Sequence, residues 1–167
     1  MNPQYKSREI EHLLGDSGAN AVIALADLVP FVTEVQDETD VETVVSVGGE
    51  AEGATEFGAF LADERLDVVD RADDDVAVQP YTSGTTGQPK GVLLTHHNLA
   101  WYAREANAIM EDGVREDDKF LGVLPLFHIY GMTVTMIATL FEGGSYWPLP
   151  EWDAAEAADL IESEGLT

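Results

Sequence analysis

Short apolar runs alternate along this chain with segments of helical periodicity, and this alternation constrains the fold more than any other feature. Residues 21–25 and 41–47 are compact runs rich in alanine and β-branched side chains, which predicts two buried strands. Before and after them, apolar residues recur every three or four positions, as on one face of a helix. Strands that alternate with helices predict an α/β fold with helices layered on a sheet that is at least partly parallel.

The individual elements follow from the same patterns. Ser7 is placed to cap a first helix in which Ile10, Leu13 and Leu14 share a face, and the glycines of 15–18 stop it. We further expect strands at 75–83, 91–95 and 119–126 and helices at 54–63, 99–110 and 129–141. Gly113 ends the second of these helices, and Gly143–Gly144 end the third. A final helix bears Ala157, Leu160 and Ile161 and begins with a capping box of Asp153 and Glu156.

Length and composition indicate one cytoplasmic domain. The chain has 167 residues, which suits a single domain, and we expect no internal boundary. It contains no cysteine, which excludes disulfides and thiolate chemistry. The start, MNPQYKSREIEHLL, does not resemble a signal peptide. The longest apolar passage, 129–141, is shorter than the ~20 residues that span a bilayer, so we expect no transmembrane segment.

The charge balance is strongly acidic. There are 8 Lys+Arg against 32 Asp+Glu, a net charge of −24. Such a chain should be repelled by nucleic acid and by anionic lipid, so a small-molecule substrate is the better prediction. Acidic residues are dispersed between apolar positions, which indicates a solvated acidic surface rather than a disordered tail. The excess acid suits a halophilic source, where high salt screens the self-repulsion.

Residues 81–92, YTSGTTGQPKGV, concentrate glycine, hydroxyl groups and a lysine in a lysine-poor chain. Glycines let the backbone approach an anion and adopt positive φ, which turns successive N–H groups toward phosphate oxygens. Hydroxyls donate hydrogen bonds, and an ammonium group supplies a point charge suited to phosphate. The candidate nucleotide-binding residues are Thr82, Ser83, Gly84, Thr85, Thr86, Gly87 and Lys90.

Two other interpretations of this segment compete. A Walker A loop has its lysine before Ser or Thr and opens a helix, whereas Lys90 lies between Pro89 and Gly91 and a strand is expected to follow. The second interpretation is a hairpin turn with no binding role, since Gly, Thr and Pro are ordinary turn residues. Each residue alone favours the turn, but their joint occurrence with one of only three lysines favours phosphate binding.

YTSGTTGQPKGV resembles the signature phosphate-binding loop of the adenylate-forming (AMP-binding) superfamily, which includes acyl-CoA synthetases and 4-coumarate:CoA ligases. LPLFHIYGM, residues 124–132, resembles the block that follows in fatty-acyl-CoA and 4-coumarate:CoA ligases. The opening, NPQYKSREIEHLLGDSGANAVI, is similar to a stretch of the same ligases. The resemblance covers nearly the whole chain and is weakest over 37–74.

The resemblance implies a chemistry. These enzymes activate a carboxylic acid, here fatty or aromatic, with ATP and Mg²⁺ to form an acyl-adenylate, and then transfer the acyl group to coenzyme A. By resemblance, Thr82–Gly87 and Lys90 hold the β- and γ-phosphates, and Thr85 helps to place Mg²⁺. The resemblance also implies that His128 lies beside the acyl carboxylate and the α-phosphate, and that Tyr130 and Gly131 line the acyl pocket.

Histidines also have plainer interpretations. His128 on its own pattern would be a hydrogen-bonded residue at a strand end. His96 and His97 follow a strand at a helix start, and we interpret them as capping or surface residues rather than metal ligands, because no third ligand is spaced with them.

The sequence also departs from the family. The family's adenine-binding strand, its glutamate and aspartate motifs and a small C-terminal domain with a catalytic lysine have no counterpart before Thr167, and Glu151 stands where some relatives carry a basic residue for CoA. We therefore expect an internal fragment of the N-terminal AMP-binding domain over 1–167. The alternative is a non-catalytic remnant that binds nucleotide weakly at most. Such a fragment should self-associate through an unpaired sheet edge and an apolar face.

Overall fold

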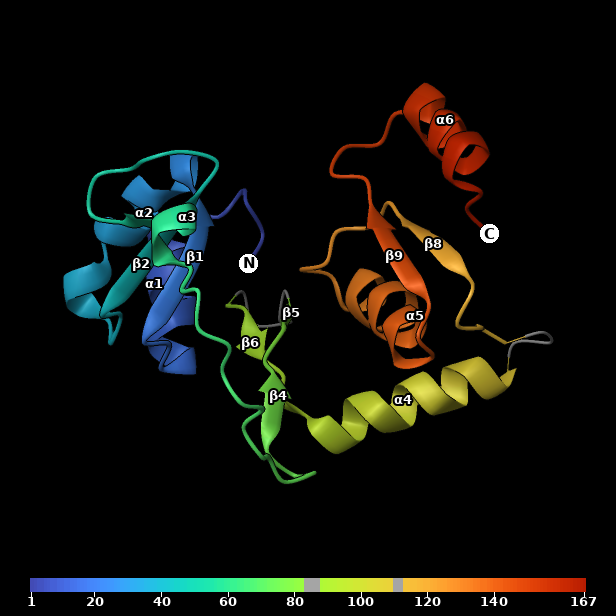
Figure 1. Ribbon diagram of the computed structural model, residues 1–167. Helices are drawn as coiled ribbons and strands as arrows, with labels where there is room; N and C mark the ends of the chain where they lie inside the picture. Colours follow the sequence, from blue (N-terminus) through green and yellow to red (C-terminus); the bar gives the residue numbers. More distant parts are fainter. Residues whose placement is uncertain (83–87, 110–112) are drawn as a thin grey trace. The chain divides into compact units, whose positions relative to one another are not determined.

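The structure is a computed structural model that describes residues 1–82, 88–109 and 113–167 (Figure 1). It contains helices, parallel strand pairs and antiparallel strand pairs, which confirms the α/β prediction. The chain forms two compact units, the first of Met1–Asp70 and Tyr81–Val92 and the second of Arg71–Pro80 and Leu93–Thr167. The composition did not predict this division. The chain crosses between the units three times, and a linker-like segment does not mark each crossing.

The first unit is built on a parallel sheet. Strands β1 (Ala21–Leu25), β2 (Thr43–Val47) and β3 (Thr55–Glu56) lie in the order β1-β2-β3, with Val22 opposite Val44 and Val45 opposite Thr55. The connection from β1 to β2 carries three short helices, η1 (Ala26–Leu28), α2 (Val29–Thr33) and η2 (Gln36–Glu38), which the periodicity did not predict. Parallel neighbours need such a crossover connection.

Helix α1 (Ser7–Ser17) confirms the first predicted helix. Its N-cap is Lys6, whose backbone N–H donates to the Glu9 carboxylate at 3.1 Å, so the Ser7 cap is wrong. The Ser7 hydroxyl instead donates to the carboxylate of Glu34. The helix ends at Gly18, whose φ of 62° is favourable only for glycine.

The core of the first unit lies between these helices and one face of the sheet. Central strand β2 is buried on both faces, whereas β1 buries Val22 and leaves Ile23 62% and Leu25 57% exposed. The prediction of a buried strand at 21–25 therefore holds for one face only. The buried cluster comprises Ile10, Leu14, Val22, Val29, Val32, Val35, Val41 and Val44.

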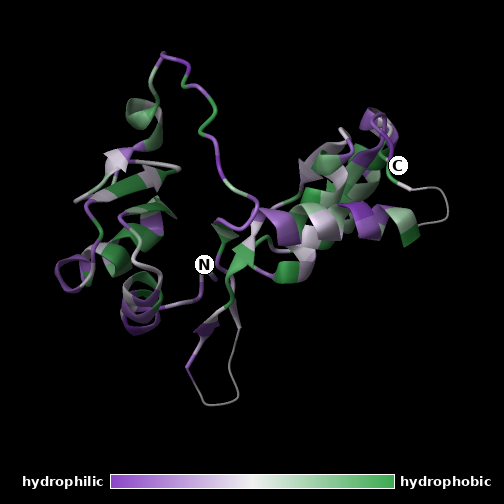
Figure 2. Ribbon diagram, turned by 90° about the horizontal axis from the view of Figure 1, so that it is seen from below, coloured by the Kyte–Doolittle hydropathy of each residue, from purple (hydrophilic) through white to green (hydrophobic). Residues whose placement is uncertain are grey.

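The helix expected over 54–63 is much shorter in the structure. Strand β3 takes its first residues, and α3 spans only Phe57–Phe60, with the Glu56 carboxylate accepting from the N–H groups of Gly58 (2.7 Å) and Ala59 (3.2 Å). After α3 the chain runs without helix or strand to residue 75, and Leu66 is 88% exposed. Figure 2 shows this stretch as an extended trace of mixed hydropathy. Helical periodicity without a surface to pack on does not stabilise a helix.

Both strands expected around the glycine-rich segment are interrupted. Residues 75–82 contain β4 (Val76–Val78) and β5 (Tyr81–Thr82), and residues 90–95 contain β6 (Lys90–Gly91) and β7 (Leu94–Thr95); Ser83, the last residue of the first predicted strand, lies outside the described residues. β5 pairs with β6 and β4 with β7, both antiparallel. Pro80 has no N–H to donate and restricts the residue before it, which explains the break between β4 and β5.

The first helix of the second unit among the described residues is α4 (His96–Ile109), which confirms the helix expected there; Met110 lies outside the described residues. The side-chain cap is not a histidine. Thr95 Oγ1 accepts from the Asn98 N–H at 3.2 Å, while Asn98 Oδ1 accepts from the Thr95 N–H at 3.0 Å, a reciprocal cap. His96 and His97 are exposed, and their backbone N–H groups donate to the carbonyls of Asp75 and Asp73.

Strand β8 (Lys119–Gly122) is shorter than the predicted 119–126 and pairs in parallel with β9 (Ser145–Pro148), which the sequence analysis missed. The rings of Phe120 and Tyr146 stack at 6.3 Å between centroids. A side chain at Gly122 would place its Cβ 2.0 Å from the Tyr146 ring. The strand therefore requires glycine at that position.

The apolar passage 129–141 is helical, as expected, but its first part is a π-helix, η3 (Tyr130–Ile137), followed by α5 (Ala138–Phe141). Thr133 and Thr139 lie buried on it and donate their hydroxyls to carbonyls four residues back, at 2.8 and 2.6 Å. These threonines satisfy their own polar groups inside an apolar layer. Gly143 and Gly144 follow the helix end, as predicted.

The last helix, α6 (Ala154–Glu164), begins where the capping pattern indicated. Asp153 Oδ1 accepts from the N–H groups of Ala155 and Glu156, each at 2.9 Å. At its other end the Lys119 ammonium donates to the Glu164 carbonyl at 2.6 Å, which ties α6 to β8. Within the described part of the chain, no helix is long and apolar enough to cross a membrane.

Ser46 offers a test of this packing. Its side chain is fully buried on β2, and its hydroxyl has no hydrogen-bond partner among the described residues. We expect Ser46→Ala to raise the free energy of unfolding by about 1 kcal/mol, because a buried unsatisfied hydroxyl is removed. Thr139→Val, which removes a satisfied hydroxyl, should lower it by about the same amount. Urea unfolding measures both, and a loss of stability in Ser46→Ala would contradict the packing described.

Candidate functional site

The strands β5 and β6 bring the two ends of the glycine-rich segment together. In their register Tyr81 lies opposite Gly91 and Thr82 opposite Lys90. Side chains directly opposite each other in a sheet share a face, so Thr82 and Lys90 point the same way. Both are exposed, while Tyr81 and Gly91 are partly buried. Ser83, Gly84, Thr85, Thr86 and Gly87, which complete the predicted site, lie outside the described residues.

Helix α1 holds both strands. His12 Nε2 lies 2.8 Å from the carbonyl oxygen of Pro89, just before β6. On β5, the Tyr81 hydroxyl shares its one hydrogen between the Asp16 carboxylate at 2.8 Å and the Leu13 carbonyl at 3.2 Å. Sequence analysis did not identify His12, Asp16 or Tyr81. These contacts join residues 65 to 77 positions apart, so no local pattern signals them.

The three lysines differ in what their ammonium groups contact. Lys6 lies 4.5 Å from the centroid of the Phe31 ring. Lys119 donates to the Glu164 carbonyl and lies 6.0 Å from the Trp147 ring centroid. Lys90 is exposed, and across the residues that the structure describes its ammonium has no ion pair, hydrogen bond or ring contact. It is therefore available to an anion.

His128 lies in the turn before η3 rather than at the end of a strand, because β8 ends at Gly122. Its Nδ1 accepts a hydrogen bond from the Tyr130 backbone N–H at 3.2 Å. The backbone N–H of His128 donates to the Pro125 carbonyl at 3.1 Å. An imidazole that accepts at Nδ1 carries its proton at Nε2. His128 is exposed, so this Nε2–H is free to donate to a ligand.

Tyr130 and Gly131 follow at the start of η3. The Tyr130 side chain is 53% exposed, whereas Gly131 is buried. A Cβ at Gly131 would lie 2.5 Å from the Pro125 carbonyl oxygen and 3.1 Å from Leu124 Cβ. Gly131 thus lets the helix pack directly on the turn that carries His128. Tyr130 and Gly131 belong to the second unit, whereas the glycine-rich segment with Lys90 belongs to the first.

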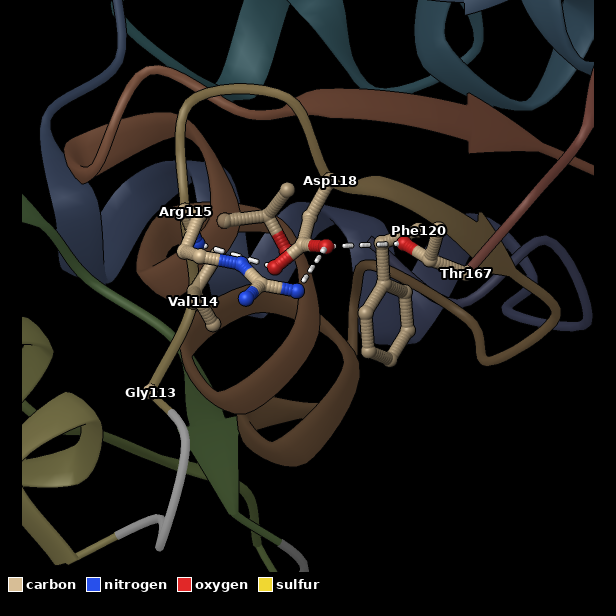
Figure 3. Close-up of a pocket in the computed structure, with 7 residues that line it drawn as sticks. Gly113, Val114, Arg115, Asp118, Phe120 and Thr167 are labelled. Carbon is tan, nitrogen blue, oxygen red and sulfur yellow. Dashed lines mark hydrogen bonds and ion pairs between the residues drawn. The ribbon is translucent and has the colours of Figure 1, made fainter.

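The hollow shown in Figure 3 lies in the second unit and encloses about 220 Å³. Its Asp118 accepts from the Arg115 backbone N–H at 2.9 Å and from the Thr167 hydroxyl at 3.1 Å. The first bond is the main cause that lowers the pKa of Asp118; desolvation opposes it, and the Thr167 hydroxyl and the Arg115 guanidinium add to it. The described walls of this hollow are Gly113, Val114, Arg115, Asp118, Phe120, Thr139 and Thr167, and the predicted site residues that the structure describes are not among them.

Metal ligation depends on residues that are only partly described. Over the ranges 1–82, 88–109 and 113–167, no three His, Asp or Glu side chains gather closely enough to hold an ion. The predicted Mg²⁺ contact, Thr85, lies outside those ranges.

Known proteins resemble the chain over its whole length. The family described as AMP-binding enzyme matches residues 1–167. The chain is 36% identical over 173 residues to "4-coumarate--CoA ligase 3" of Oryza sativa subsp. japonica, and 28% identical over 195 residues to "Long-chain-fatty-acid--CoA ligase" of Bacillus subtilis (strain 168). Each match covers 99% of this chain but only 30% and 35% of the relative. The chain thus spans about a third of the length of these relatives.

A solved structure shares the fold. ATP-bound MatB from Rhodopseudomonas palustris superposes with a TM-score of 0.81 and 29% sequence identity, covering 98% of this chain and 32% of that one.

The lowered pKa of Asp118 makes a testable prediction. A carboxylate whose pKa is lower in the folded state stabilises the fold above its ordinary pKa of about 4, and this contribution is lost as the pH falls through the lowered value. The stability difference between wild type and Asp118→Asn should therefore be largest above pH 5 and shrink toward pH 2.5. Urea unfolding across that range measures it. Asp117→Asn, which changes an exposed neighbour, serves as control; a pH-independent difference for Asp118→Asn would contradict the assignment.

Proposed function

Because the chain belongs to the family of AMP-binding enzymes, we propose that it is part of an ATP-dependent carboxylate:CoA ligase that forms an acyl-adenylate and then an acyl-CoA. The observation that supports this most directly is Lys90. It is an exposed ammonium in a chain of net charge −24, fixed by strand pairing on the same face as the Thr82 hydroxyl. An exposed cation beside a hydroxyl donor suits phosphate.

Binding of the nucleotide falls to the glycine-rich segment. Lys90 and Thr82 hold the β- and γ-phosphates together with the residues between them, Ser83, Gly84, Thr85, Thr86 and Gly87. An ammonium group there stabilises the charge that develops on pyrophosphate as it leaves. Thr85 also helps to place Mg²⁺, which would neutralise phosphate charge when bound.

His128 acts at the acyl carboxylate. Its Nδ1 is engaged by the Tyr130 N–H, so the proton sits on the exposed Nε2 and can be donated in a hydrogen bond to a carboxylate or α-phosphate oxygen. The backbone contact fixes the orientation of the ring, which lowers the cost of positioning the donor.

The acid is fatty or aromatic. Tyr130 presents a half-exposed aromatic ring next to His128 and, with Gly131 behind it, forms part of the acyl pocket. The names of the two relatives, a coumarate ligase and a long-chain fatty-acid ligase, point to the same two classes. Coenzyme A is the acceptor, although Glu151 supplies no positive charge where some relatives carry a basic residue.

A second candidate function is a weak nucleotide-binding module without catalysis. The described residues supply contacts for phosphate and carboxylate, and none has been assigned to adenine or ribose. Under this alternative the 167-residue chain binds ATP weakly and supports no turnover.

Isotope exchange between pyrophosphate and ATP tests the enzyme assignment, measured in the full-length protein at high salt with a panel of fatty and aromatic acids. We expect Lys90→Ala to slow exchange about a hundredfold, because a charge that stabilises the departing pyrophosphate is lost, and His128→Ala to slow it by a similar factor. The controls are Lys6→Ala, which removes the same charge from the first unit, and His97→Ala, an exposed histidine of the second; both should exchange within about twofold of wild type. Wild-type rates in Lys90→Ala and His128→Ala with every accepted acid would refute both roles.

The acidic surface also supports a halophilic, cytoplasmic protein. At about 0.1 M salt the screening length is ~10 Å, and at 1 M it is ~3 Å, so repulsion among 32 carboxylates should fall steeply between these conditions. We expect the free energy of unfolding to rise continuously from 0.1 to 3 M KCl. Urea unfolding at each concentration measures this, and a stability that is flat or falls over that range would count against a halophilic origin.

A further inference from the structure

Helix α1 contacts both strands that flank the glycine-rich segment, and this arrangement is separate from the phosphate contacts already proposed. One contact reaches β6 through Pro89 and the other reaches β5 through Tyr81. All the residues involved belong to the first unit.

The contact to Pro89 acts on Lys90 through the peptide bond. The Pro89 carbonyl oxygen and the Lys90 nitrogen belong to one planar peptide unit, so fixing the oxygen fixes the start of the Lys90 residue. His12 Nε2 lies 2.8 Å from that oxygen, and the imidazole is half-buried. Since a carbonyl can only accept, His12 donates from Nε2.

The contact to Tyr81 fixes the direction in which the Thr82 side chain points. Successive side chains of a strand point to opposite faces. The Tyr81 hydroxyl shares its hydrogen between Asp16 and the Leu13 carbonyl of α1, so the next side chain, Thr82, points away from the helix. Thr82 lies opposite Lys90, so both candidate phosphate ligands project from the face that α1 leaves open.

These bonds matter because the strands are short. β5 and β6 have only two residues each, and an isolated two-stranded pair is marginally stable in water. A site that binds a transition state needs its groups held within a fraction of an ångström by surrounding hydrogen bonds. The helix supplies that support through side chains that do not themselves reach the phosphate face.

We infer that His12 is a positioning residue for nucleotide binding, which donates to the Pro89 carbonyl and thereby orients Lys90, with Tyr81 and Asp16 performing the matching role for Thr82. This inference rests on the proposed function for its consequence in catalysis, but not for the contacts. It assigns the carboxyl-terminal half of α1 to the support of the nucleotide site.

The test compares His12→Phe, which keeps an aromatic ring but removes the donor, with His12→Gln, whose amide nitrogen can reach the position of Nε2. In the full-length protein we expect His12→Phe to raise KM for ATP about three- to tenfold, the effect of one hydrogen bond, and to leave KM for the carboxylic acid unchanged. His12→Gln should restore KM for ATP to within about twofold of wild type. Tyr81→Phe should raise KM for ATP as His12→Phe does, and His97→Phe, on the other unit, is the matched control.

Amide hydrogen exchange supplies a readout independent of activity. His12→Phe and Tyr81→Phe should speed exchange at the amides of Tyr81, Thr82, Lys90 and Gly91, with His12→Gln and His97→Phe close to wild type. Unchanged exchange at these amides, or equal rises in KM for ATP and for the acid, would overturn the inference. If the wild-type protein shows no ATP-dependent exchange of pyrophosphate while the amides respond as expected, the proposed function fails and the anchoring role of α1 stands.

Discussion

The antiparallel pairing of β5 with β6 is the constraint on which the candidate nucleotide site depends. It brings two segments separated by seven residues into register and places Thr82 beside Lys90. Two residues on each side cannot hold this geometry alone. The stability of the pair comes from α1, which the parallel sheet in turn holds through Ile10 and Leu14 in the core. Packing of the first unit is thus transmitted to the site by three hydrogen bonds.

In the second unit, close packing at two glycines positions the elements around His128. Gly122 admits the Tyr146 ring, and Gly131 brings η3 against the Pro125 carbonyl. The same turn holds His128, whose Nδ1 is occupied by a backbone N–H of that helix. A side chain in place of Gly122 would displace the Tyr146 ring, whereas one in place of Gly131 would push the helix away from the Pro125 carbonyl oxygen. The orientation of His128 is therefore a consequence of packing as much as of its own hydrogen bond.

The net charge of the chain explains why the position of Lys90 matters for phosphate binding. In a chain of net charge −24, most of the surface repels a nucleotide. Two of the three lysines contact aromatic rings, and one of these two also caps a helix, which leaves Lys90 as the lysine available to phosphate within the described ranges. With only 8 Lys+Arg against 32 Asp+Glu, an exposed lysine beside the Thr82 hydroxyl defines a binding position for phosphate more sharply than a broad basic patch would.

Several features of this protein follow from sequence alone. The strands at 21–25 and 41–47, the second of which begins at Thr43 in the structure, have local signals, as do α1, α4 and the Asp153 cap. Helix caps and apolar periodicity depend on neighbours within a few positions. The glycine-rich segment and the LPLFHIYGM block were likewise sufficient to predict the family, which the match over residues 1–167 confirms. Only the tertiary structure decided that 54–63 is not one helix, that β9 joins β8, that the chain forms two units, and that His12 supports Lys90. Those outcomes depend on which surfaces meet across dozens of residues, and a pattern read along the chain carries no information about such distant contacts.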